Sequence, residues 1–164
     1  MFERYQPDLD AYVRRVRTGP CFVCAIVARD PDFPDHPIVD EGAIVFLTMH
    51  PTQYGYTLVA PKGHREQAAG DFTVEEYLGP QRVVHRVAEA VREEVGAERV
   101  YILSLGSNQG NAQVHWHVVP LPPGTPYEEQ QFAALILETA GALKIPEGEK
   151  TALAARIGQR MERP

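Results

Sequence analysis

The chain has 164 residues, of which 44% are hydrophobic and 23% are charged, values that suit one globular domain. Its net charge of -6 argues against binding a long nucleic acid, which needs many lysines and arginines, but a few local donors can hold one small phosphorylated ligand. No apolar run approaches the roughly 18 residues of a membrane span. The first residues lack the apolar segment of a secretory signal, so we expect a cytoplasmic protein with no membrane partner.

The N-terminal half contains two predicted strands. The first dozen residues predict a helix or an arm, and the proline-rich stretch 29–35 predicts a loop. Two β-rich runs follow, at 43–48 and 56–60, with a turn at 51–55 between them. Because the connection is short, we expect the two runs to pair as antiparallel neighbours.

A long helix is predicted over residues 71–96. It begins at a capping-box pattern, T-x-x-E from Thr73, and Gly96 suits its C-terminal cap. Gly79-Pro80 would kink this helix or delay its start, because proline cannot donate a backbone hydrogen bond.

One face of the predicted helix carries a recurring apolar stripe, formed by Tyr77, Val84, Ala88, Val91 and Val95. Val83 and Val87 lie off this stripe. Small two-layer domains often bury such surplus apolar surface by two-fold association, so we expect a homodimer.

After the helix the pattern returns to strands. Runs at 99–104 and 114–119 predict strands, and the stretch 106–112 between them predicts a polar loop. Helical stretches follow near 127–140 and 149–161. The order strand, strand, long helix, strand, strand indicates an α+β fold with an antiparallel sheet and a C-terminal helical extension.

The last predicted strand carries two histidines on one face. Strand side chains alternate, so Gln113, His115 and His117 share a face, while the other face suits a core and consists of Val114, Trp116 and Val118. The loop before this strand supplies backbone N–H groups and polar side chains, Ser107, Asn108 and Gln109, to which phosphate oxygens can bind. Histidine can attack phosphorus, so the strand suits catalysis on a phosphate, with metal ligation and plain polar packing as the alternatives.

The segment QVHWHVVP, residues 113–120, resembles the signature of the histidine-triad (HIT) family. The segment PKGH at 61–64, the C-F-V-C run at 21–24 and the GSNQGN loop at 106–111 are also similar to family elements. The resemblance implies a single HIT-like domain over residues 1–164, with a core at about 21–120 and an extension at 121–164.

The resemblance implies a fold that binds nucleotides, is usually dimeric and reacts through a nucleotidyl-histidine. His115 then corresponds to the nucleophile, and His117 to the triad member that hydrogen-bonds phosphate. Gln109 and Gly110 correspond to the family's phosphate loop, beside Asn108. Glycine at 110 replaces a hydroxyl side chain, so we expect its backbone N–H to serve there.

Three further positions depart from the family pattern. Gln113 replaces the first triad histidine, and an amide cannot shuttle a proton at pH 7. We therefore expect a preference for polyphosphate leaving groups, which need less protonation than an amine. Thr48 occupies the position of an acidic or amide residue that contacts ribose. Tyr56 stands where a histidine commonly follows the turn.

Cys21 and Cys24 form a C-x-x-C pair, which in a chain without a signal does not predict a structural disulfide. By resemblance, Cys21, Cys24 and His64 could bind a structural zinc. The alternative is a pair of reduced, packed cysteines, because Gln113 replaces the histidine that is the fourth ligand in metal-bearing members. No metal or other cofactor is expected to be required for turnover.

We therefore predict a nucleotidyl hydrolase or transferase that acts on an α-phosphate of a nucleotide conjugate or dinucleoside polyphosphate. The alternative is a nucleotide-binding regulatory module with little turnover. By resemblance, Phe22, Ile26 and Phe46 would double as a base pocket. His50, in the turn after the first strand, is expected to stay away from the site.

Overall fold

The computed structural model describes residues 2–33, 36–40 and 42–162, and its centre is a five-stranded antiparallel sheet in the order β2-β3-β4-β6-β5. These strands are β2 (Pro37–Asp40), β3 (Ala43–Leu47), β4 (Thr57–Pro61), β5 (Arg99–Ser104) and β6 (Trp116–Leu121). The predicted antiparallel pairing of the first two runs is confirmed, with Ala43 opposite Pro61 and Leu47 opposite Thr57. The α+β class is therefore confirmed, and strand β2 is an addition that the sequence pattern did not indicate.

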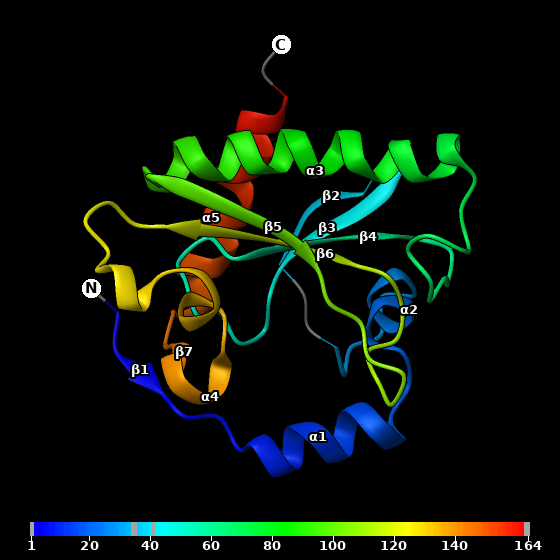
Figure 1. Ribbon diagram of the computed structural model, residues 1–164, viewed down its shortest axis with the longest axis horizontal. Helices are drawn as coiled ribbons and strands as arrows, with labels where there is room; N and C mark the ends of the chain where they lie inside the picture. Colours follow the sequence, from blue (N-terminus) through cyan, green and yellow to red (C-terminus); the bar gives the residue numbers. More distant parts are fainter. Residues whose placement is uncertain (1, 34–35, 41, 163–164) are drawn as a thin grey trace.

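Alternation along β3 and β4 divides the core into two layers. Val45 and Val59 face the long helix, and Ile44 and Leu58 face the opposite side of the sheet. Every residue of both strands is buried, because helices cover both faces. The helices on the first face are α3 (Val74–Val95) and α5 (Glu147–Met161), and the helix on the second is α2 (Phe22–Val27) (Figure 1).

Helix α3 begins and ends as its sequence predicts. The Thr73 side chain accepts from the Glu76 backbone, the Glu76 side chain accepts from the Thr73 backbone, and Gly96 caps the other end with a φ of 64°. The expected delay at Gly79-Pro80 is wrong, because Pro80 lies buried inside a continuous helix.

The argument for a homodimer from the face of α3 is also wrong. Val83 and Val87 are buried in the same core cluster as the predicted stripe, where Leu153 and Ile157 of α5 pack. The C-terminal extension therefore covers the surplus apolar surface within the chain. Ion pairs reinforce this contact, because Arg156 of α5 binds Glu94 of α3 at 2.6 Å.

Strand β6 begins at Trp116, two residues later than predicted. Val114, Trp116 and Val118 nevertheless lie in the cluster beneath α3, so the predicted alternation of faces is confirmed. The consequence for the site is that Gln113 and His115 belong to the segment that leads into the strand, whereas His117 belongs to the strand itself.

The N-terminal segment lies apart from the sheet. Its helix α1 (Leu9–Thr18) crosses the molecule on the side opposite α3, and none of its residues is fully buried (Figure 1). Strand β1 (Arg4–Tyr5) pairs with β7 (Ala142–Leu143) of the C-terminal extension. Besides β7 and α5, that extension contains η1 (Tyr127–Glu129), η2 (Gln131–Ala134) and α4 (Leu137–Ala140).

The loop expected at 29–35 has no helix or strand where it is described, and residues 34–35 lie outside the described part. No helix among the described residues is long and apolar enough to span a membrane.

Candidate active site

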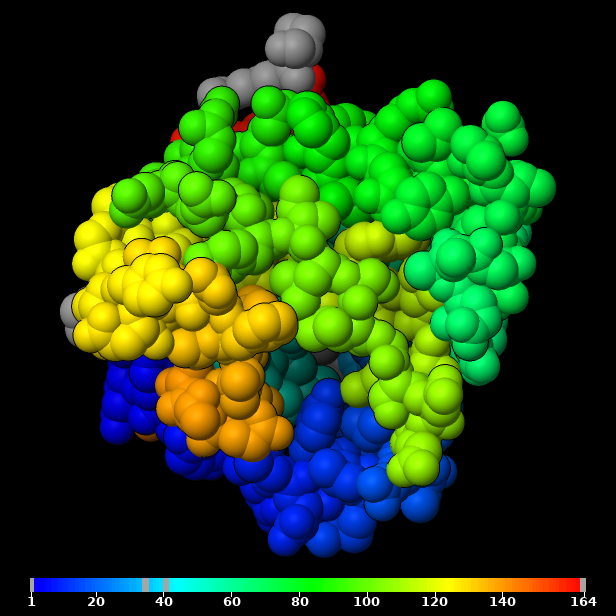
Figure 2. All heavy atoms as spheres, in the orientation of Figure 1, coloured from blue at the N-terminus to red at the C-terminus, as the bar shows by residue number. Residues whose placement is uncertain are grey.

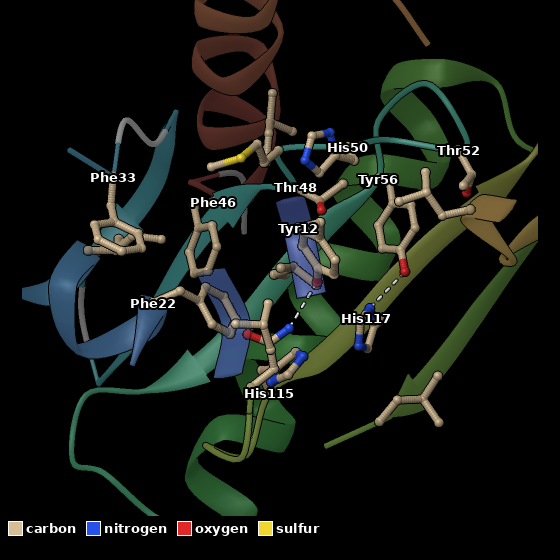
Figure 3. Close-up of a pocket in the computed structure, with 18 of the residues that line it drawn as sticks. Tyr12, Phe22, Phe33, Phe46, Thr48, His50, Thr52, Tyr56, His115 and His117 are labelled. Atoms are coloured by element: carbon tan, nitrogen blue, oxygen red, sulfur yellow. Dashed lines mark hydrogen bonds between the residues drawn. The ribbon is translucent and has the colours of Figure 1, made fainter. Parts of the chain in front are cut away.

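Two histidine side chains meet at the start of β6. The ring centroids of His115 and His117 lie 4.8 Å apart, and both rings border a cavity of about 260 Å³ (Figure 3). His115 is only 4% exposed, and the ring of Phe22 meets it edge-on at 5.3 Å. The predicted pairing of these histidines on one face is therefore confirmed.

Each histidine is held through its Nδ1 atom. Nδ1 of His115 lies 2.7 Å from the backbone oxygen of Gln113, and Nδ1 of His117 lies 2.7 Å from the hydroxyl of Tyr56. Burial lowers the pKa of His115 despite the hydrogen bond to Gln113, and burial together with the neighbouring His115 lowers the pKa of His117 to about 4. Both imidazoles are therefore neutral at pH 7.

An apolar compartment extends away from the two histidines. The rings of Phe22 and Phe46 lie 6.3 Å apart, and Ile26 and Phe33 also line the cavity. Figure 3 shows Phe33 at the end remote from His117, beyond Phe46. The cavity thus has a polar end at the histidines and an aromatic end that suits a flat ring.

The N-terminal helix forms a wall of this cavity. Tyr12, Arg15 and Val16 line it, and its opening lies between α1, the 105–112 loop and the C-terminal extension (Figure 2). The guanidinium of Arg15 lies 5.9 Å from the centre of the Phe33 ring and donates to the sulfur of Met49 at 3.2 Å. Sequence reasoning missed this wall, although positions 12, 15 and 16 have the spacing of one helical face.

The charge of the cavity is opposite to that of the protein. Among the described residues that line it, Arg15 is the one permanently charged side chain and none is an aspartate or glutamate. His50 also lines the cavity, so the expectation that His50 stays away from the site is wrong. Nδ1 of His50 lies 3.1 Å from the Tyr5 hydroxyl. Such a lining suits an anionic ligand.

The predicted ligand-binding positions are divided between two hollows. Thr48 lines the cavity of the histidines, as expected for a contact with the ligand. Gln109 and Gly110 line a second, adjoining hollow between the loop and α1, and Asn108 lines neither. From the loop, Asn111 reaches the main cavity, where its amide donates to the Tyr12 hydroxyl at 2.9 Å.

The structure explains the glycine at position 110. Its φ of 130° is accessible mainly to glycine, and a Cβ there would lie 2.3 Å from a side-chain methyl of Val16 and 2.6 Å from its carbonyl oxygen. The loop therefore needs glycine to pack against α1, and a hydroxyl side chain has no room.

The Gln113 side chain is turned away from the cavity. Its Oε1 accepts hydrogen bonds from the thiols of Cys21 and Cys24 at 3.0 and 3.2 Å, and lies 3.1 Å from Nδ1 of His64. Its amide nitrogen donates to the backbone oxygen of Pro61. Gln113 therefore contacts His115 through its backbone and the two cysteines through its side chain.

The cysteine cluster fits a zinc ion. The ligand atoms of Cys21, Cys24 and His64 lie within 4.8 Å of one another, and zinc bonds of about 2.0–2.3 Å would require only modest closing. The Gln113 oxygen lies 3.0 to 3.2 Å from a ligand atom of each of the three residues and would be the fourth ligand of such an ion. The cluster ties α2 to the segments before β6 and after β4, so a metal there would be structural.

A family model described as HIT domain matches residues 34–123, more than half of the chain. The chain is also 31% identical over 106 residues to the protein named "Protein hit" of Bacillus subtilis (strain 168), an alignment that covers 62% of this chain and 70% of the relative. The chain therefore belongs to the HIT family.

Solved structures share the fold over most of the chain. A zinc-bound histidine triad family protein from Mycobacterium smegmatis is 27% identical, with a TM-score of 0.66 over 87% of this chain and 95% of that one. A hypothetical histidine triad nucleotide-binding protein from Sulfolobus tokodaii is 22% identical, with a TM-score of 0.68 over 87% and 92%. The N-terminal residues 2–33, which contain α1, lie outside the family match.

Proposed function

We propose that the chain is a nucleotidyl hydrolase or transferase that uses His115 as a covalent nucleophile. One observation carries this proposal: the Nδ1 atom of His115 hydrogen-bonds a backbone carbonyl. A carbonyl can only accept, so Nδ1 holds the proton and Nε2 holds a free lone pair. His117 is beside it, and the pocket lining suits an anion.

The reaction has two displacements. Nε2 of His115 attacks the α-phosphorus, a P–N bond forms, and the P–O bond to the leaving group breaks as that oxygen takes the electron pair. The oxygen of water or phosphate then attacks the same phosphorus, the P–N bond breaks, and its electron pair returns to Nε2, which releases the nucleotide and the neutral imidazole. When water is the acceptor, its proton passes to the solvent. His117 stabilises the charge on a non-bridging oxygen in both steps, the contribution that usually dominates phosphoryl transfer.

The shape of the cavity suggests how the nucleotide lies. The α-phosphate is at the histidines, and the base lies among Phe22, Phe46 and Phe33. Thr48 lies on the wall of the same cavity and is the proposed ribose contact. Gln109 and Gly110 line the adjoining hollow, which is the proposed place for the rest of the phosphate chain.

Position 113 supplies no acid to the leaving group, because the Gln113 side chain lies in the cysteine cluster. An amine leaving group needs a proton more than a phosphate does. We therefore expect dinucleoside polyphosphates to be better substrates than nucleoside phosphoramidates. Chromatographic comparison of kcat/KM for one adenosine substrate of each type tests this.

Zinc is a proposed structural component with no step in the reaction. The ligands would be Cys21, Cys24 and His64. The bound ion would fix the position of the segment before β6, which contains Gln113. The chemistry at phosphorus uses protein side chains, so no cofactor is proposed for turnover.

A regulatory nucleotide-binding module is the second candidate. The observation that favours it is the position of Gln109 and Gly110, which border the second hollow and are not among the residues around the cavity of the histidines. In that case fewer donors would contact the phosphate at the histidines, and the bound nucleotide would be hydrolysed slowly. Covalent labelling of His115 distinguishes the two candidates.

The test is incubation with an α-labelled nucleotide followed by a denaturing quench. Acid-labile, alkali-stable labelling is expected in the wild type and should vanish in His115→Ala, with kcat lower by on the order of 10³-fold. His85→Ala is the matched control, because His85 lies exposed on α3, far from the cavity lining. A folded His115→Ala protein with near wild-type turnover would show the proposal to be wrong.

A further inference from the structure

Tyr56 and His117 form a buried pair across two strands. Tyr56 immediately precedes β4, and the register places Leu58 of β4 opposite His117 of β6. The Tyr56 side chain is 8% exposed, and its hydroxyl lies 2.7 Å from Nδ1 of His117 (Figure 3). No other hydrogen bond of this hydroxyl is found among the described residues.

The direction of this hydrogen bond follows from the strength of the two donors and acceptors. Each direction leaves one donor and one acceptor of the pair without a partner, so the number of unpaired groups is the same in both. A phenol O–H is more acidic than the N–H of a neutral imidazole, and the imidazole lone pair is a better acceptor than a phenol oxygen. The tyrosine O–H therefore donates to Nδ1, and Nε2 of His117 carries the imidazole proton.

The observed surroundings agree with the first arrangement. Nε2 of His117 is buried and has no hydrogen-bond partner among the described residues. It belongs to a ring that borders the cavity beside His115. An N–H donor at that atom would find its partner in an anionic oxygen of the ligand.

We propose that Tyr56 is a positioning residue that fixes His117 as the Nε2–H tautomer, so that His117 donates a hydrogen bond to a phosphoryl oxygen. The inference rests on the proposed function for its catalytic consequence. The two neighbouring histidines then hold opposite tautomers: the Gln113 carbonyl leaves a lone pair on Nε2 of His115, and the Tyr56 hydroxyl leaves a proton on Nε2 of His117. One ring attacks while the other donates.

The groups around the pair keep it neutral. Burial raises the pKa of Tyr56 with a smaller effect of Tyr12, so the phenol keeps its proton. Burial and the neighbouring His115 lower the pKa of His117 by more than the nearby backbone of Leu105, which does not meet the geometry of a hydrogen bond to Nε2, raises it. The pair therefore holds the same protons from neutral pH down to about pH 4.

Nitrogen-15 NMR of the histidine rings reads the tautomer directly. In the wild type we expect a protonated Nε2 and an unprotonated Nδ1 for His117, assigned by loss of its signals in His117→Ala. In Tyr56→Phe we expect a mixture of both tautomers. The control is Tyr101→Phe, which removes a hydroxyl that accepts a hydrogen bond from the Gln131 backbone and lies outside the cavity.

Kinetics provide a second readout. Tyr56→Phe should lower kcat by about tenfold, the effect of about one hydrogen bond, with KM changed by less than about threefold. Tyr56→His restores a ring donor and should recover part of kcat. Tyr101→Phe should leave both parameters unchanged.

The outcomes separate this inference from the proposed function. A wild-type His117 with its proton on Nδ1 overturns the inference even if no variant folds, as does an unchanged tautomer or an unchanged kcat in folded Tyr56→Phe. If the wild type proved inactive on all nucleotides, the proposed function would fail, while the tautomer measurement would still decide the role of Tyr56.

Discussion

The backbone oxygen of Gln113 accepts a hydrogen bond of 2.7 Å from Nδ1 of His115, while the side chain of the same glutamine accepts from two cysteine thiols. One residue therefore links the proposed nucleophile to the proposed metal cluster. The backbone bond needs no particular side chain at position 113, so the proposed tautomer of His115 does not depend on the glutamine side chain.

The pH dependence of activity follows from the lowered pKa values. Attack requires neutral His115, and its pKa lies below the usual 6.5. We expect kcat/KM to fall on acidification with a midpoint below pH 6.5, because burial keeps the His115 ring neutral to lower pH than a free imidazole. A dinucleoside polyphosphate is the suitable substrate, since its phosphates do not titrate in this range. A midpoint at or above pH 6.5 would contradict the burial argument.

Protein stability should decline over a related pH range. The pKa of His117 falls from 6.5 to about 4 on folding. Between these pH values His117 is protonated in the unfolded state and neutral in the folded state. Stability is therefore lost as pH falls from about 6.5 to about 4, by on the order of 3 kcal/mol. Urea unfolding at pH 7 and pH 5 measures the part of this loss that occurs above pH 5. In His117→Gln the free energy of unfolding should fall less between these two pH values. A fall equal to that of the wild type would mean that other titratable groups cause it.

The sequence predicted the parts of the site that depend on local pattern. Alternation placed Val114, Trp116 and Val118 in the core and left His115 and His117 on the other face, because the period of a strand is independent of the rest of the fold. The direction of the Gln113 side chain could not be predicted this way. It is decided by Cys21 and Cys24, about 90 residues away along the chain.

The N-terminal wall illustrates a second limit of the sequence pattern. Helix α1 has amphipathic spacing, but which surface it covers depends on long-range contacts such as Asn111 with Tyr12. The same limit explains the wrong interpretation of Val83 and Val87. Their position on the helix was read correctly, and the partner that buries them is α5 of the same chain.

Zinc removal should lower stability and leave activity intact. A metal at Cys21, Cys24 and His64 binds the folded state preferentially, so a chelator should lower Tm, while the groups around phosphorus remain in place. Gln113→His should bind zinc more tightly, because imidazole is a better zinc ligand than an amide. Cys24→Ser is the control and should bind less. Complete loss of activity in folded, chelated protein, with recovery on adding zinc, would refute a purely structural role.

Arg15→Ala should weaken nucleotide binding. Arg15 is the one permanent cation among the described residues that line the cavity, and no ion pair with a carboxylate is found for it among the described residues. Its side chain is exposed, so solvent reduces the effect, and we expect KM to rise about threefold to tenfold with little change in kcat. Arg14→Ala is the matched control, because Arg14 lies next to it on α1 without lining the cavity. Equal effects of the two substitutions would indicate only a general charge effect.

We still expect a homodimer, but with an interface at the edge of β5 and not on α3. Strand β5 ends the described sheet, and its outer edge has no partner among the described strands. Ile102 and Leu105 beside this edge are 49% and 56% exposed. Tyr127 and Phe132 of the adjoining extension are 77% and 70% exposed, and a hydrogen bond from the Gln131 backbone to Tyr101 holds that extension beside β5. Such an edge would pair antiparallel with a second copy.

Light scattering at micromolar concentration should therefore give about 37 kDa, twice the 18.3 kDa of one chain. Ile102→Lys places a charge on the edge of β5 and should shift the equilibrium toward the monomer, because a dimer interface would have to bury it without a partner. Leu78→Lys is the control: Leu78 is 43% exposed on α3, away from β5, and should leave the mass unchanged. A wild-type mass near 18 kDa would rule out the dimer. A dimer that dissociates in Leu78→Lys and persists in Ile102→Lys would place the interface on α3, the surface that α5 has already largely covered.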